Sequence, residues 1–287
     1  MKINFYEEFP KKENLDKIKL INFPTNLIIT SKSINEFKSI KNKIKNYKNK
    51  KISDVIYWPN LDEKEGYWFS AFSKHSALKR TINELKNNNK NLTIMWDAEL
   101  PMLRKSLFFT QLLNYFKNKK LINEFFSNAK NYNIEILTSE YPLENKFFRK
   151  ILSKLFIVSF DSNIYNNKKI AMLYTSFFKK HKNIEKYLEN QIITGKKLYK
   201  NNFMVALGCI APGILGNEPL LNPRELERDL RIMKKNNIKE VVIFRLGGLN
   251  KEYIKTIKKF LNQILNLSPT LRRVLNVKYT NKREPVM

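Results

Sequence analysis

Two acidic residues near the middle of the chain are spaced for acid–base chemistry. Asp97 and Glu99 follow the apolar run 94–96, and on a continued strand residues two apart point the same way. Carboxyl groups held that close disfavour joint ionisation, which raises one pKa and can keep one group protonated near neutral pH. We therefore predict that Asp97 and Glu99 are catalytic. The alternative is that both only accept hydrogen bonds from loop amides.

Further charged residues stand where other apolar runs end. Glu7 and Glu8 follow the first run, Glu140 follows the fifth, and Arg245 follows the eighth. The chain has only 26 acidic residues, so several of them after successive strands favour a shared substrate-binding cluster over a random solvated surface. Individually, Glu8 or Glu140 could instead cap the following helix.

All three tryptophans lie close to such strand ends. Trp58 and Trp68 flank the exit of the third run, and Trp96 directly precedes Asp97. Indole faces beside carboxylates suit sugar rings, which stack through their C–H faces while their hydroxyls take directional hydrogen bonds. We predict that the three tryptophans bind substrate; they could also simply cover the mouth of the fold.

The elements that must position these residues alternate along the chain. Short apolar runs typical of buried parallel strands occupy residues 3–6, 27–30, 54–58, 92–96, 134–138, 170–174, 203–207 and 241–244. Helix-like segments separate them, at residues 33–47, 73–87, 102–132, 144–155, 183–197, 222–236 and 250–265. Eight such units predict a (β/α)₈ TIM barrel, whose chemistry lies on the loops after the strands.

One further apolar run does not fit this alternation. Residues 156–160 read as a ninth strand, joined to the sixth by too few residues for a crossover helix. We predict a hairpin or an inserted strand there, with an open doubly wound sheet as the alternative. The barrel domain is expected to span residues 1–267 and to be followed by a C-terminal tail, 268–287.

Two short motifs resemble the chitinase-like glycoside hydrolases of family 18. Asp97-x-Glu99-x-Pro101 is similar to the end of that family's Asp-x-x-Asp-x-Asp-x-Glu motif, and Met172-Leu173-Tyr174 is similar to its Met-x-Tyr. The resemblance implies that Glu99 protonates the glycosidic oxygen. It also implies that Asp97 orients a substrate N-acetyl group, which attacks the anomeric carbon, and that Tyr174 hydrogen-bonds this group.

The same resemblance has departures. The two earlier acids of the motif fall on Leu92 and Met95, and Arg245 stands where the family has a tryptophan. A retaining mechanism with two carboxylates therefore stays open. In that mechanism Glu99 would be the acid/base and Glu7, Glu8 or Glu140 the nucleophile.

The loops after the seventh and eighth runs suggest another chemistry. They hold five of the seven glycines, at Gly208, Gly213, Gly216, Gly247 and Gly248. Bare backbone amides at this place bind phosphate in many barrels, and Arg245 could add a bidentate grip. A lyase or isomerase of a phosphorylated sugar is thus an alternative, although glycine can also merely supply turn geometry.

The composition bounds the remaining choices. With 54 Lys and Arg against 26 Asp and Glu, the net charge is +28. This allows a non-catalytic barrel that binds nucleic acid or a protein partner, or codon drift in an AT-rich genome. His75, His181 and Cys209 are the only soft metal ligands, so we expect no cofactor and no zinc; magnesium on Glu7, Asp97 and Glu140 stays open.

The expected location follows from the same sequence. The N-terminus has no apolar leader, and the apolar stretches fall short of a membrane span. A single cysteine excludes an internal disulfide and fits a reducing compartment. We expect a cytoplasmic protein without a membrane partner.

Overall fold

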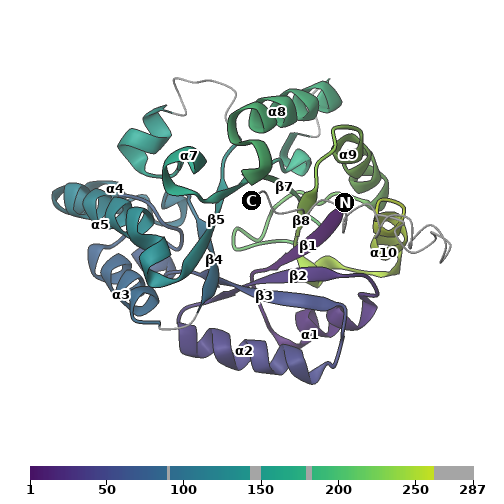
Figure 1. Ribbon diagram of the computed structural model, residues 1–287, viewed down its shortest axis with the longest axis horizontal. Helices are drawn as coiled ribbons and strands as arrows, with labels where there is room; N and C mark the ends of the chain where they lie inside the picture. Colours follow the sequence, from purple (N-terminus) through teal and green to yellow (C-terminus); the bar gives the residue numbers. More distant parts are fainter. Residues whose placement is uncertain (89–90, 143–149, 179–182, 262–287) are drawn as a thin grey trace, which may run out of the picture.

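Eight parallel strands close into a barrel, as the sequence predicts (Figure 1). The computed structural model describes residues 1–88, 91–142, 150–178 and 183–261. Each strand pairs with its neighbours in chain order, and β8 pairs with β1. The strands are β1 (Lys2–Glu7), β2 (Thr25–Ser31), β3 (Ile52–Pro59), β4 (Leu92–Asp97), β5 (Ile134–Glu140), β6 (Lys168–Met172), β7 (Phe203–Gly208) and β8 (Glu240–Phe244).

Helices surround the barrel between successive strands (Figure 1). They are α1 (Lys12–Leu15), α2 (Ile34–Asn46), α3 (His75–Lys86), α4 (Leu107–Thr110), α5 (Tyr115–Asn128), α7 (Ser162–Tyr165), α8 (Ile184–Tyr199), α9 (Pro223–Lys235) and α10 (Lys251–Lys258). Local chemistry fixes several starts: Asn222 and Glu225 form a capping box at α9, and the Asn250 side chain accepts the Glu252 and Tyr253 amides at α10.

Alternation along each strand divides the core into two parts. Outward-facing residues pack against the helices: Trp96 of β4, for example, lies 5.6 Å from Phe125 of α5 between ring centroids. Inward-facing residues form a separate cluster inside the barrel. This inner cluster comprises Tyr6, Ile28, Ile56, Trp58, Met95, Leu137, Ile170, Met172, Met204, Ala206, Cys209, Val242 and Phe244.

The ninth strand predicted for residues 156–160 does not form. Leu152–Phe156 is a π-helical turn, and Ile157 adopts a left-handed conformation with a φ of 55°, which interrupts an extended backbone. The Phe160 amide donates to the Glu140 side chain instead of to a neighbouring strand. Ile157, Val158 and Phe160 of this run are buried, but as an irregular segment against the outside of the barrel.

Three predictions fall on residues outside the described ranges. They are the tail 268–287, the first half of the helix expected at 144–155, and the end of the helix expected at 250–265. Within the described ranges, no helix combines the length and hydrophobicity that crossing a bilayer would take.

Candidate active site

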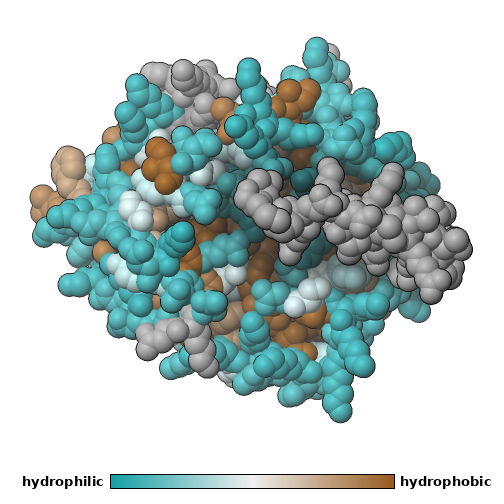
Figure 2. Space-filling model, in the orientation of Figure 1, coloured by the Kyte–Doolittle hydropathy of each residue, from teal (hydrophilic) through white to brown (hydrophobic). Residues whose placement is uncertain are grey.

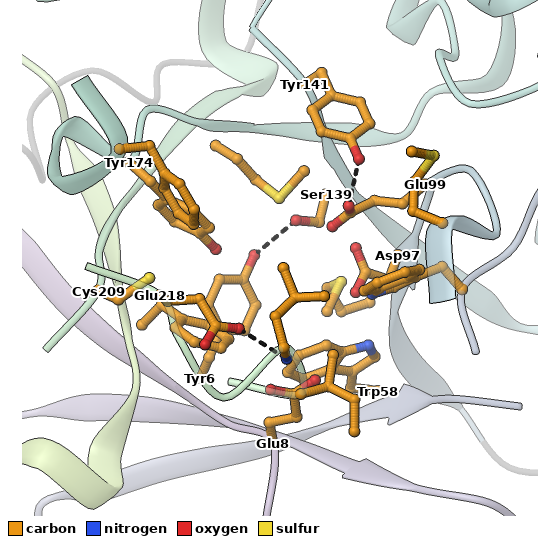
Figure 3. A pocket seen from close by; sticks show the side chains of 18 of the residues that line it. Tyr6, Glu8, Trp58, Asp97, Glu99, Ser139, Tyr141, Tyr174, Cys209 and Glu218 are labelled. Carbon is orange, nitrogen blue, oxygen red and sulfur yellow. Dashed lines mark hydrogen bonds between the residues drawn. The ribbon is translucent and has the colours of Figure 1, made fainter. Parts of the chain in front are cut away.

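A cavity of about 360 Å³ opens at the carboxyl ends of the strands (Figure 3). It is the place where the loops of a TIM barrel carry chemistry. Acids, tyrosines, tryptophans and apolar side chains line it together: Tyr6, Glu8, Trp58, Trp68, Met95, Asp97, Glu99, Met102, Ser139, Tyr141, Pro142, Met172, Tyr174, Phe177, Phe178, Cys209, Ile214, Leu215, Glu218 and Phe244.

Asp97 and Glu99 lie within hydrogen-bonding reach of each other on one wall of this cavity. Asp97 is buried, and desolvation together with the neighbouring Glu99 raises its pKa well above the ordinary value, which a hydrogen bond from Trp58 only partly opposes. Removal from bulk water raises the pKa of Glu99 to about 7, and the Tyr141 hydroxyl donates to its Oε2 at 2.6 Å. The pair therefore holds a proton near neutral pH.

Glu8 supplies a third carboxyl to the lining of the cavity. Burial raises its pKa to about 7, although the Tyr67 hydroxyl donates to its Oε1 at 2.7 Å. Its Oε2 has no hydrogen-bond partner among the residues that the structure describes. Glu218 adds a like charge near Glu8. Both carboxyls approach Gly213: Glu8 Oε2 and Glu218 Oε1 each lie 2.8 Å from the point that a Cβ atom would occupy on this glycine.

Aromatic rings form the floor between the acids. Tyr6 lies 5.3 Å from Trp58 between ring centroids, and Phe244 lies 6.1 Å from Tyr6 and 5.7 Å from Tyr174. The Tyr6 hydroxyl donates to Ser139 Oγ at 3.4 Å. Burial raises the pKa of both Tyr6 and Tyr174, so both hydroxyls stay protonated and can donate to a polar ligand.

The rim of the cavity is more apolar than its floor. Met102, Phe177, Phe178 and Leu215 line it and remain 41 to 49% exposed. Such side chains bind apolar groups or ring faces, whereas the acids below them act on polar groups.

The structure brings six of the ten predicted site residues to the cavity. These six are Glu8, Trp58, Trp68, Asp97, Glu99 and Tyr174. Glu7, Trp96, Glu140 and Arg245 do not line it. Strand alternation explains the difference, because residues two apart share a face: Asp97 follows Met95 of the inner cluster, whereas Trp96 between them points outward.

Trp96 is fully buried beneath the helices. Its ring stacks on Phe69 at 4.1 Å and meets Phe126 edge-on at 5.5 Å. It is part of the outer core, and it offers no face to a ligand in the cavity.

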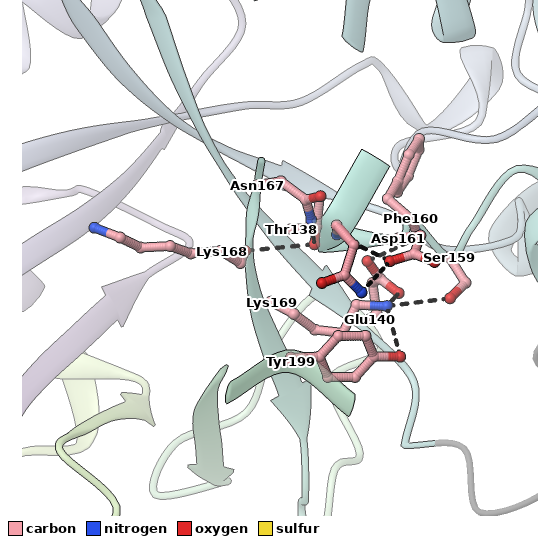
Figure 4. A network of polar contacts seen from close by, with 10 residues as sticks. Thr138, Glu140, Ser159, Phe160, Asp161, Asn167, Lys168, Lys169 and Tyr199 are labelled. Atoms are coloured by element: carbon pink, nitrogen blue, oxygen red, sulfur yellow. Dashed lines mark hydrogen bonds and ion pairs between the residues drawn. The ribbon is translucent and has the colours of Figure 1, made fainter. Parts of the chain in front are cut away.

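Glu140 instead forms a buried ion pair on the outer side of β5 (Figure 4). Its Oε2 lies 2.6 Å from Lys169 Nζ, and its Oε1 accepts the Phe160 amide. Lys169 Nζ also donates to Ser159 and Tyr199, each at 3.3 Å. The carboxylate therefore holds the irregular segment that was expected to be a strand.

Glu7 and Arg245 bind each other. Arg245 Nη1 donates to Glu7 Oε1 at 2.9 Å, and Arg245 Nε donates to the Pro212 carbonyl. Backbone amides of Phe9 and Gly247 donate to the same carboxylate at 2.8 and 2.7 Å. The guanidinium and the glycine-loop amide expected to bind a phosphate thus bind the protein's own carboxylate, which joins the β1 and β8 ends of the barrel.

Several cavity residues were missed by the sequence analysis. Alternation backward from Glu8 would have found Tyr6, and alternation forward from Leu137 would have found Ser139, just after the predicted strand 134–138. Tyr141 continues the same face of β5. Glu218 lies in a loop without periodicity, and no sequence signal singles it out.

Metal ligands do not gather in the part of the chain described. No group of three or more His, Cys, Asp or Glu side chains there is arranged to hold a metal ion. Glu7 and Glu140, for which magnesium shared with Asp97 was left open, are engaged with Arg245 and Lys169 on the outer side of the strands. His181 lies outside the described residues.

Comparison with known proteins gives the fold. The sequence matches no family model and no curated protein. The glycoside hydrolase domain of PgaB (BpsB) from Bordetella bronchiseptica superposes with a TM-score of 0.55 at 7% identity, covering 91% of this chain and 99% of that one. The spore cortex-lytic enzyme SleL from Bacillus cereus gives 0.55 at 11% identity, covering 90% and 74%. A D-tagatose 3-epimerase-like protein gives 0.52 at 12%, covering 92% and 98%. At these identities the chain is similar to all three in its barrel architecture.

Proposed function

We propose that the protein hydrolyses glycosidic bonds of a carbohydrate, with Glu99 as the proton donor. The observation that carries this proposal is the pair of inward-facing carboxyls, Asp97 and Glu99, which lie within hydrogen-bonding reach of each other in a cavity with aromatic walls. Protonation of the leaving oxygen by a carboxylic acid is the step that such hydrolysis needs. Similar barrels include a glycoside hydrolase domain and a spore cortex-lytic enzyme, which agrees with this chemistry.

The residues divide the reaction between them. Glu99, with a pKa raised to about 7, gives its proton to the glycosidic oxygen as the C–O bond breaks. By the resemblance to family 18, the carbonyl oxygen of a substrate 2-acetamido group forms the new bond to the anomeric carbon. Asp97 and Tyr174 orient this group, and water then displaces it with Glu99 as the base.

Glu8 is the less suitable nucleophile. Its pKa is raised to about 7 by burial, so a large part of it is protonated near neutral pH, and a protonated carboxyl does not attack carbon. We assign it to substrate binding, together with Trp58 and Trp68, which line the cavity.

Replacing Glu99 by Gln tests the proposal. The Gln side chain keeps the size but cannot donate the proton, so turnover of fluorogenic glycosides with a 2-acetamido group should fall by about 10²- to 10⁴-fold. Glu124→Gln is the matched control, because Glu124 is exposed on α5, away from the cavity. A folded Glu99→Gln protein with unchanged activity would dismiss the assignment.

The alternative, a lyase or isomerase of a phosphorylated sugar, lacks among the described residues the free phosphate-binding groups that it would need. Arg245 and the Gly247 amide are occupied by Glu7, and a phosphate would have to displace a buried ion pair. We keep the cytoplasm as the proposed location, because a chain with a single cysteine forms no internal disulfide and fits a reducing compartment.

A further inference from the structure

The helical segment that follows Glu99 in the chain exposes large apolar side chains to solvent. Phe109, Leu112, Leu113 and Phe116 are exposed by 77, 56, 92 and 76%. Their spacing of three, four and seven residues places them on one face of a helix, and they lie on α4, the 3₁₀ turn Leu112–Asn114 and the start of α5. We call these four residues the apolar stripe. Figure 2 shows hydrophobic surface at the left edge, where Figure 1 places α4 and α5.

The opposite face of the segment is held against the barrel by specific contacts. Asn118 is fully buried, and its Nδ2 donates to the carbonyls of Ala71 and Ser73 at 2.9 and 2.8 Å. Asn118 Oδ1 also lies 2.7 Å from His75 Nδ1, and Gln111 accepts the His75 amide. Rotation of the segment would break these bonds, so the apolar stripe cannot turn inward.

Aromatic contacts fill the same inner face. Phe108 and Tyr115 pack on Phe72 with ring centroids 5.1 and 5.5 Å apart. The inner face therefore already has its own apolar partner. The apolar stripe is a second hydrophobic face, and four large side chains in helical register facing water are typical of a contact surface.

The charges around the apolar stripe have one sign. Residues 100–123 contain no acid and five cationic residues. Arg104, Lys105 and Lys117 are exposed, and Lys120 is exposed beside Glu124 at 3.7 Å. Apolar side chains with a basic margin complement a surface that is anionic outside and apolar inside.

We propose that the apolar stripe docks the protein on the surface of an anionic lipid bilayer. The four side chains enter the boundary between headgroups and acyl chains, and the flanking cations contact lipid phosphates. A second copy of the chain is a poorer partner, because two basic margins would face each other in a molecule that carries +28. The proposal departs from the expectation of a protein without a membrane partner, which concerned only membrane spans and leaders; it needs no membrane span and does not rest on the proposed activity.

This docking would set the orientation of the cavity. Met102 begins the same segment, is 48% exposed and lines the cavity rim. The rim is apolar as well, so a bound protein would present the cavity close to the lipid surface. The glycans that it meets there are those carried on lipids or lying against the bilayer.

Vesicle binding tests the docking surface directly. The full chain is sedimented with vesicles of phosphatidylcholine alone and with about 30% phosphatidylglycerol, at about 0.1 M and at higher salt. We expect binding to the anionic vesicles at least about tenfold stronger than to the neutral ones. The triple variant F109Q/L113Q/F116Q should lose at least about tenfold in that binding while unfolding at the same temperature as the natural chain.

A matched control separates the apolar stripe from general stickiness. Ile164 and Ile193 are 72 and 58% exposed on α7 and α8, so I164Q/I193Q removes similar exposed side chains elsewhere and should bind as the natural chain does. The proposal is overturned if the chain does not bind anionic vesicles, if the triple variant binds them equally, or if the apolar stripe instead holds a dimer that the triple variant dissociates. Glycosidase activity is measured separately on soluble substrates, so either proposal can fail alone.

Discussion

At the scale of single residues, the cavity favours the protonated form of carboxyl groups that would be ionised in water. Glu8 and Asp97 are buried, Glu99 lines the cavity, and all three have raised pKa values. Desolvation of the charged form is the largest cause for each. Folding therefore binds protons that the unfolded chain would release, and the cavity costs stability as the pH rises.

Glu8 gives the clearest test of this cost. Its pKa is about 7 in the folded protein against an ordinary value of 4.5, so its favourable contribution is complete below about pH 4.5 and is lost as pH rises through 7. Glu8→Gln removes the titration. The free energy of unfolding of Glu8→Gln relative to the natural chain should rise by about 2.5 kcal/mol from about pH 5 to about pH 8. Urea denaturation at both pH values measures it.

The control for this titration is an acid outside the cavity. Glu13 is exposed on α1, so Glu13→Gln should leave the pH dependence of unfolding unchanged. Parallel stability curves for Glu8→Gln and the natural chain would show that Glu8 is not desolvated as described.

At the scale of elements, the Glu140–Lys169 ion pair attaches an irregular segment to the barrel (Figure 4). Both side chains are at most 5% exposed. Such pairs give little net stability over an apolar replacement, but removal of one partner leaves the other charge buried and unpaired.

Lys169→Met should therefore destabilise the fold by about 3–5 kcal/mol, whereas the double variant Glu140→Leu with Lys169→Met should recover much of that loss. Thermal or urea unfolding of the single and double variants measures the difference. Equal stability of Lys169→Met and the natural chain would mean that the pair is solvated and does not fix the 157–160 segment.

Elements also show what the sequence could and could not predict. The alternating apolar runs predicted all eight strands within a few residues, because buried parallel strands have a distinct pattern. The run at 156–160 has that pattern too, and only tertiary contacts, above all the Glu140 bond to Phe160, distinguish it from a strand. Proximity in sequence grouped Trp96 with Asp97, although one-residue steps change face on a strand.

At the scale of the whole molecule, the fold does not account for the net charge of +28. Some cations have local tasks, as when Arg80 binds Glu65 and Lys259 binds Glu227. The chain should therefore bind nucleic acid weakly and without sequence preference, through counterion release alone.

Salt dependence tests this prediction. Affinity for a mixed-sequence DNA duplex should fall by about 10³-fold or more between about 50 and 200 mM salt, with no preference among sequences. Fluorescence anisotropy with several duplexes measures both properties. Tight binding that survives salt, or that selects one sequence, would support the alternative of a nucleic-acid-binding barrel.

The alternation of inward and outward residues on the strands also bears on how such a protein can change over generations. Substitutions at Met95, Ser139 or Met172 alter what the cavity accepts without touching any helix, whereas their chain neighbours carry the contacts that hold the shell together. Substitutions at inward-facing positions can therefore change the specificity of the cavity without changing the fold. A barrel that retains its shape at 7 to 12% identity to other barrels is what this separation of tasks permits.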